Sequence, residues 1–160
     1  MITRTGLPAS ITDELLTRLT ARVPSSTGET WKLTEVYTGE VITALPQSTP
    51  EDVAAAFRRA RDAQRVWSQW PVRKRLAVFR RFHKLLIERN DTIVDLIQAE
   101  SGKARKMAFE ETIDPMMITT HYLKRAPKLL KPTRRAGPVP LVSSSTEIRQ
   151  PKGVVGIIAP

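Results

Sequence analysis

The sequence predicts an α/β protein of which this chain forms a mainly α-helical part, with one β-hairpin and a few strands near the C-terminus. Apolar residues recur at three- and four-residue steps between Val53 and Trp70, which is the period of an amphipathic helix. Two β-prone runs flank Thr38-Gly39-Glu40, as in a hairpin. Residues 151–160 form an apolar run bounded by Gly and Pro. Such a run is typical of a parallel strand that is covered on both faces.

The first part of the chain predicts a short helix followed by the hairpin. Ser10 stands where it could cap a helix over residues 11–19, because a hydroxyl at that position accepts a bond from a free backbone N–H. Residues 24–28 are Pro-Ser-Ser-Thr-Gly, a composition that predicts a turn or linker. We expect the two strands of the hairpin at residues 31–37 and 41–45.

The strongest helix start in the sequence is Thr49-Pro50-Glu51-Asp52. The threonine hydroxyl can cap the helix, proline suits the first helical position, and acids favour the positive end of the helix dipole. We expect this helix to run to about Trp70 and to break at Pro71.

Three further helices are predicted before the C-terminal region. The second carries apolar residues from Leu76 to Leu86, and Asn90 is expected to cap the third. Gly102 is expected to end the third helix in the left-handed conformation that glycine adopts at low cost. The fourth spans residues 103–126, with a kink at Pro115.

The C-terminal region predicts extended structure. Prolines and glycines mark a connection at residues 131–140, and strands are expected at 139–142, 145–150 and 154–158. A parallel strand needs a crossover and a neighbour of the same kind. Since nothing in the printed sequence after residue 158 could supply either, we expect the chain to be a piece of a larger fold.

Composition limits the chemistry that the chain could perform. Its 160 residues suffice for a domain with its own core, and 41% hydrophobic with 26% charged residues is typical of a globular protein. Cysteine is absent, which excludes disulfides, thiol nucleophiles and Cys-ligated metal, and the pair His83 and His121 gives little support for a metal site. There is no apolar stretch of the roughly 20 residues that span a bilayer, nor an apolar leader. We therefore expect a cytoplasmic protein with no metal site and no membrane partner.

The net charge of +10 raises the alternative of a module that binds nucleic acid or another polyanion. Basic residues gather between Arg58 and Lys84 and again between Lys124 and Arg135. However, Arg58, Arg61 and Arg65 fall opposite the apolar stripe of their predicted helix. This placement favours a solvated helix face, so a nucleic-acid partner is not expected.

Three segments, in this order and spacing, carry a family resemblance: YTGEVITALPQSTPEDVAAAFRRARDAQRVWSQWP, ESGKARKMAFEETID and PKGVVGIIAP. From about Trp31 to Pro160 the chain resembles the N-terminal third of the aldehyde dehydrogenase superfamily. The stretch RRAGPVPLVSSSTEIRQPKGVVGIIAP looks most like the succinate-semialdehyde dehydrogenase branch. Pro115 and Met116-Met117 depart from the smooth, Ala-rich helix that is more common in the family.

The resemblance implies a mechanism as well as a fold. In the family, a cysteine thiolate attacks an aldehyde, hydride passes to NAD or NADP, and a water activated by glutamate hydrolyses the thioester. Neither that cysteine nor that glutamate belongs to this chain, which therefore supplies no catalytic residue and should be inactive alone, with no cofactor of its own. Its expected cofactor-lining residues in the parent enzyme are Ile158, Ala159 and Pro160. The NAD or NADP preference stays open.

The resemblance also divides the chain into parts. Residues 1–30 would be an N-terminal helix and linker, and 31–133 the hairpin and the helical part of the cofactor-binding domain. Residues 134–152 would be an extended segment of the type that joins protomers in a homo-oligomer, and 153–160 the first strand of an incomplete dinucleotide-binding sheet. A second alternative follows, in which the chain is an interaction fragment that pairs with full-length subunits through residues 138–151.

Overall fold

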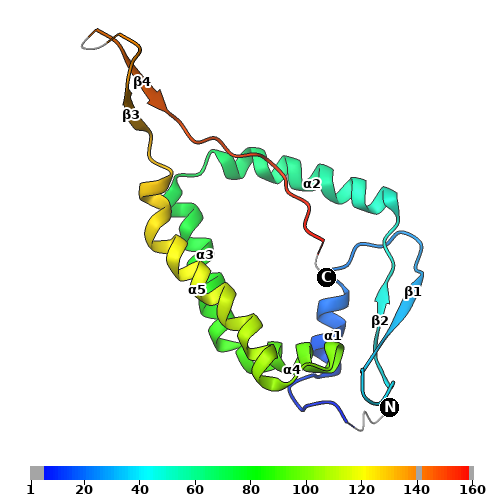
Figure 1. Cartoon of the computed structure of the whole chain (residues 1–160). Helices are drawn as coiled ribbons and strands as arrows, with labels where there is room; N and C mark the ends of the chain where they lie inside the picture. Colours follow the sequence, from blue (N-terminus) through cyan, green and yellow to red (C-terminus); the bar gives the residue numbers. More distant parts are fainter. Residues whose placement is uncertain (1–5, 140–141, 159–160) are drawn as a thin grey trace.

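The computed structural model describes residues 6–139 and 142–158. Figure 1 shows an open frame in which α2 forms one side, α3 and α5 run together along another, and α4, α1 and the first hairpin complete the rest. In chain order the elements are α1 (Asp13–Thr20), β1 (Thr30–Thr34), β2 (Val41–Pro46), α2 (Pro50–Ser68), α3 (Val72–Glu88), α4 (Asn90–Ser101), α5 (Arg105–Leu129), β3 (Thr133–Ala136) and β4 (Ser144–Glu147). The mainly helical prediction is confirmed.

The first hairpin forms as predicted. β1 and β2 pair antiparallel, with Trp31 opposite Leu45 and a register irregularity after Leu33. The loop turns at Gly39, whose positive φ of 72° suits glycine. The backbone N–H of Val36, just after β1, donates to the Ala99 carbonyl over 3.2 Å, so the hairpin is fastened to α4.

The second hairpin corrects the predicted strand positions. β3 lies within the stretch expected to be an irregular connection, and it pairs antiparallel with β4. The predicted strand at 139–142 is partly outside the described residues, and Val142 itself lies in a turn. An ion pair between Arg135 and Glu147, with Nη2 and Oε2 2.7 Å apart, joins the two strands. Figure 1 shows this hairpin projecting away from the helices.

Local signals placed the start of α2 correctly. Thr49 Oγ1 accepts from the Asp52 backbone N–H over 3.1 Å, and Asp52 Oδ2 accepts from the Thr49 N–H over 3.0 Å. The hydrogen bond from the Thr49 backbone lowers the pKa of Asp52. Burial opposes this effect but is smaller than it, and hydrogen bonds from Ser26 lower the pKa further. The helix ends at Ser68, ahead of Pro71.

Two predicted caps are wrong because their side chains make tertiary bonds instead. Thr12, not Ser10, caps α1, and Ser10 donates to Asp95 Oδ2 over 2.5 Å. Asn90 is the first residue of α4 rather than its cap, and its Oδ1 accepts from Thr112 Oγ1 on α5 over 2.6 Å. Both bonds join elements that are far apart in sequence, which local patterns cannot show.

The described core is small and centres on α4. Ile42 of β2 is fully buried and belongs to a cluster with Ile11, Leu16 and Ala99. On another side of α4, Val94 is 1% exposed, while Ala108 and Thr112 of α5 are equally enclosed. Helix α5 continues through Pro115 and Pro127 to Leu129 and packs against both α3 and α4. No helix in the described part of the chain is long and apolar enough to cross a membrane.

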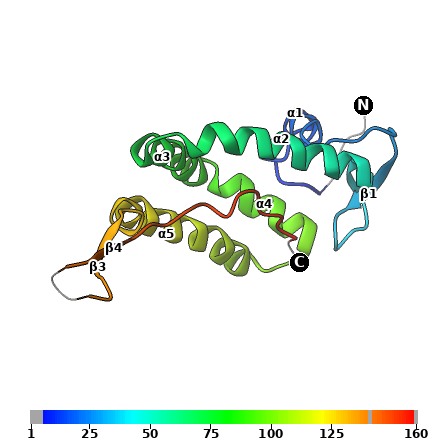
Figure 2. The ribbon, with the colours of Figure 1, turned by 90° about the horizontal axis from the view of Figure 1, so that it is seen from above.

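Helix α2 leaves much of its apolar stripe uncovered. It has no buried residue, and Val53 and Phe57 are 61% and 50% exposed. Figure 2 shows α2 on the opposite side of α4 from α5. Helix α2 has the predicted amphipathic period, but none of the described elements covers its apolar face around Val53 and Phe57.

The terminal segment also corrects a prediction. Residues 154–158 form no strand, and Val155, Ile157 and Ile158 are strongly exposed. A strand requires a pairing partner, and both sheets among the described residues are two-stranded and exclude this segment. The apolar run is therefore extended and uncovered.

Gly102 offers a test of the left-handed C-cap. Its φ is 69°, and a Cβ placed there would lie 3.0 Å from Val36 Cγ1. We expect Gly102→Ala to lower the free energy of unfolding by about 1–2 kcal/mol, as measured by urea denaturation. Gly28→Ala is the matched control, because Gly28 has a φ of 74° and open space around it. Equal losses in both variants would contradict a steric role for the Val36 contact.

Asp95 offers a test based on pH. Burial raises its pKa, but hydrogen bonds from Ser10 and Arg105, together with the Arg105 charge, outweigh burial and leave the pKa below its ordinary value. Its stabilising effect is then present above the unfolded pKa of about 3.9 and is lost as pH falls through the folded value. We expect Asp95→Asn to lower the melting temperature near neutral pH, with the difference from wild type shrinking in acid.

Circular dichroism at a series of pH values measures this difference. Asp91→Asn is the control, because Asp91 is 90% exposed and its Oδ1 lies 3.7 Å from Arg105 Nη2. If the melting temperature of Asp95→Asn differs from that of the wild type by the same amount at every pH, the carboxylate charge does not have the proposed role.

Candidate functional site

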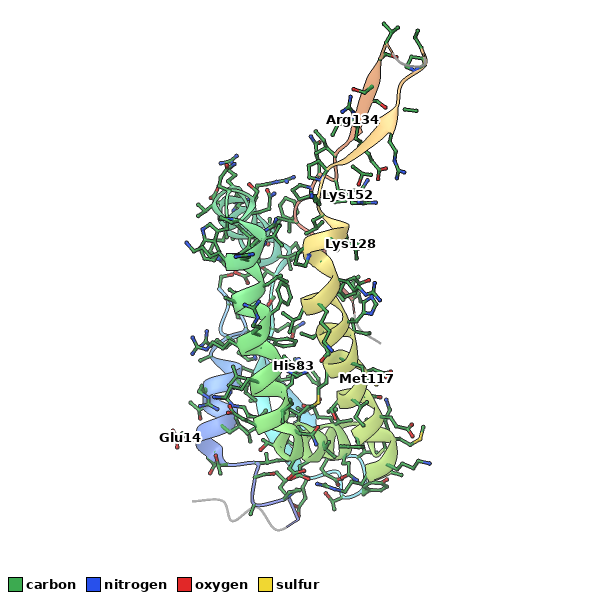
Figure 3. All side chains as sticks on the ribbon, turned by 90° about the vertical axis from the view of Figure 1, so that its left-hand side faces the viewer. Glu14, His83, Met117, Lys128, Arg134 and Lys152 are labelled. Carbon is green, nitrogen blue, oxygen red and sulfur yellow. The ribbon has the colours of Figure 1, made fainter. Side chains whose placement is uncertain are left out.

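An apolar groove of about 380 Å³ lies where the end of α2 meets α3 and α5. Figure 3 shows α3 and α5 side by side along most of their length. The first turns of α3 face the last turns of α5, so the two helices are antiparallel. The groove is lined by Trp67, Val72, Arg75, Leu76, Phe79, Ile118, Thr119, Tyr122, Leu123, Ala126 and Leu130.

Aromatic rings close one end of this groove. The Trp67 ring lies 5.2 Å from that of Trp70 and 6.5 Å from that of Phe79. Lys74 Nζ sits 3.9 Å from the Trp70 ring centre, a distance suited to a cation–π contact. Trp67 and Trp70 are half-buried at the α2–α3 corner, and Trp31 is 51% exposed. Trp67 and Trp70 thus pack at the α2–α3 corner, whereas Trp31 lies in β1 opposite Leu45.

Arg75 is the unusual polar residue of the groove. Its Nε atom is buried and has no hydrogen-bond partner among the described residues. Leaving a buried donor unpaired costs about 1–3 kcal/mol, so an acceptor is expected where the guanidinium lies. Arg75 belongs to the basic stretch between Arg58 and Lys84 that was expected to form a solvated face. The signal for a different role was its place beside Val72, Leu76 and Phe79 on one helix face.

The two histidines lie beside a second, shallower hollow of about 480 Å³ between α3 and α5. His83 is half-buried, and its Nε2 lies 2.9 Å from Thr120 Oγ1, as expected for a boundary residue. His121 is exposed and packs edge-on against Tyr122. Figure 3 labels His83 on α3 and Met117 across from it on α5. Residues 6–139 and 142–158 contain no group of three or more His, Asp or Glu side chains that could hold a metal ion.

The expected cofactor-lining residues are only partly visible. Ile158 is 98% exposed, and Ala159 and Pro160 lie outside the described residues. The segment that leads to them passes α2, where a Cβ on Gly153 would come within 2.6 Å of Arg61 Nη1. Figure 1 shows this segment returning from the second hairpin past α2. Of the three expected residues, the structure therefore describes Ile158 alone.

Sequence comparisons extend over nearly the whole chain. The aldehyde dehydrogenase family model matches residues 4–160. The chain is 47% identical over 126 residues to a Mycolicibacterium smegmatis protein named "putative succinate-semialdehyde dehydrogenase", NADP(+)-type. That match covers 79% of this chain and 24% of the relative. A Mycobacterium ulcerans protein of the same type is 41% identical over 154 residues, covering 96% of this chain and 30% of the relative.

Solved structures show the same fold. The NADP-dependent glyceraldehyde-3-phosphate dehydrogenase of Bacillus halodurans, complexed with NADP, matches with a TM-score of 0.66 and 29% identity, over 72% of this chain and 24% of that one. Staphylococcus aureus betaine aldehyde dehydrogenase, in complex with NAD+, matches with a TM-score of 0.67 and 23% identity, over 74% and 24%. The chain thus spans about a quarter of the length of these proteins. On the family match and the agreement in fold, it belongs to the aldehyde dehydrogenase family.

Proposed function

We propose that the chain is the N-terminal segment of an NADP-dependent succinate-semialdehyde dehydrogenase. The observation that carries the proposal is the 47% identity over 126 residues to a relative named for that activity. In the reaction, the aldehyde, NADP+ and water give succinate, NADPH and two protons. The aldehyde carbon is oxidised, and its hydride reduces the nicotinamide.

The chain's own contribution to this enzyme is structural. We propose that residues 31–133 form the hairpin and helical part of the cofactor-binding domain and that 153–160 form the first strand of its sheet. Exposed Val155 and Ile157 support this assignment, since both side chains would be buried in a sheet covered on both faces. Ile158, Ala159 and Pro160 would then lie along the cofactor. The nucleophile comes from elsewhere in the protein, because this chain has no cysteine.

We further propose that residues 134–152 join protomers of a cytoplasmic homo-oligomer. The projection of the β3–β4 hairpin from the helical body supports this role, because its outer edges are free to pair with another chain. The same surface would serve the alternative in which the chain is an interaction fragment. Co-purification with full-length relative subunits that depends on this hairpin would favour that alternative.

The first prediction concerns activity. The isolated chain should not reduce NADP+ or NAD+ with succinate semialdehyde. A fusion of residues 1–160 to the remaining segment of the Mycolicibacterium smegmatis relative should oxidise succinate semialdehyde with NADP+, as measured by absorbance of the reduced nicotinamide. The intact relative is the control. A fusion that is folded but inactive, or an isolated chain that turns over after contaminating dehydrogenases are removed, would contradict the proposed function.

The second prediction tests the polyanion alternative, which is favoured by exposed arginines on α2 and α3 and by the net charge of +10. Electrostatic binding without base contacts is weak and falls steeply with salt. We therefore expect duplex DNA to bind with an affinity on the order of micromolar or weaker at low salt and to dissociate near physiological salt. Fluorescence anisotropy of labelled DNA measures this. Tight binding to one sequence at physiological salt would instead support a nucleic-acid function.

A further inference from the structure

We propose that the groove between α3 and α5 binds an amphipathic helix from the part of the enzyme subunit that this chain does not span, and that Arg75 donates a hydrogen bond to an oxygen of that helix. The proposal rests on the proposed function for the identity of the subunit. It assigns a docking surface and its polar anchor to residues of this chain.

The shape of the groove suits a helix. Antiparallel α3 and α5 each contribute side chains spaced three or four residues apart, such as Leu76 and Phe79 on one wall and Ile118 and Tyr122 on the other. Rows with this spacing form ridges that pack into the grooves of a third helix. An amphipathic helix recognised by such a trough uses its own apolar residues at the same spacing.

The walls of the groove are uncovered in the described chain. Phe79, Ile118 and Tyr122 are 46%, 56% and 54% exposed. Leu76, at the base, is 7% exposed, so the groove has a packed floor and an open top. Contiguous apolar surface of this kind marks an interaction site.

The charge of the groove indicates what the occupant carries. The lining contains the Arg75 guanidinium and no carboxylate, and Arg75 Nε is buried without an acceptor. The occupant must therefore present an oxygen at this point. A helix can do so with an Asp or Glu side chain or with one of the free carbonyls of its last turn.

A second copy of the chain fits this groove less well. A symmetric dimer would place the same patch on both sides of the interface, and two Arg75 side chains would meet with no acid in either lining. The relatives are instead roughly three to four times as long as the matched region, since it covers 24% of one and 30% of another. The remainder of such a subunit has ample length to supply a covering helix.

The test uses co-expression of the chain with the remaining segment of the Mycolicibacterium smegmatis relative, with an affinity tag on that segment. We expect both parts to co-purify in equal amounts. Ile118→Lys should lower the recovered chain about tenfold or more, because docking would bury an unpaired charge. Met117→Lys is the matched control, since Met117 is 64% exposed on the same helix but outside this groove. It should leave recovery unchanged.

Arg75→Met tests the polar anchor. It keeps much of the side-chain volume but removes the donor, and we expect recovery to fall about tenfold, with Arg73→Met on the exposed side of α3 as control. Circular dichroism of each variant chain checks that the helices are retained. Failure to co-purify, equal effects of the groove and control variants, or self-association that Ile118→Lys abolishes would each overturn the proposal.

These outcomes separate the docking surface from the proposed function. A complex that forms through the groove but does not oxidise succinate semialdehyde would contradict the proposed function and leave the surface in place. An active complex whose recovery is unchanged by Ile118→Lys and Arg75→Met would contradict the docking surface and leave the proposed function in place.

Discussion

Helix α4 is the element on which the rest of the described structure depends. Its Ala99 packs into the core with Ile42 of β2 and Leu16 of α1, and the Ala99 carbonyl accepts the bond from Val36. Asp95 binds Ser10 and Arg105 at once, so one carboxylate joins the N-terminal segment to α5. Helix α4, which is twelve residues long, thus connects the N-terminal segment, the first hairpin and α5.

Other apolar surfaces of the described chain are left without cover. The stripe of α2, the α3–α5 groove and the terminal segment all present large apolar side chains to solvent. They lie on different elements, so no small local rearrangement would bury all three. All three belong to a chain that covers about a quarter of the length of its relatives.

Features that depend on neighbouring residues were predictable from the sequence, whereas features that depend on distant contacts were not. The Thr49 cap and the left-handed Gly102 each arise within a few residues, and both formed as predicted. By local rules Ser10 and Asn90 are also good caps. Their side chains instead form hydrogen bonds with residues that are distant in sequence. The apolar run at 154–158 predicted a buried strand, but these residues form no strand and are mostly exposed, because a strand needs a neighbour with which to pair. The role of Arg75 in the candidate groove could not be predicted from the sequence, because its unpaired Nε depends on the packing of α5 against α3.

The distribution of polar groups links the docking surface to the wider architecture. Most of the chain's cations are exposed and can be solvated, and several are paired, as Arg135 is with Glu147. Arg75 differs because its Nε is enclosed by apolar walls, where water cannot replace a missing acceptor at low cost. Such a group favours one partner geometry over the many that a purely apolar groove would accept. Apolar burial would therefore supply most of the affinity at this surface, while a single directed hydrogen bond would fix how the partner helix is placed.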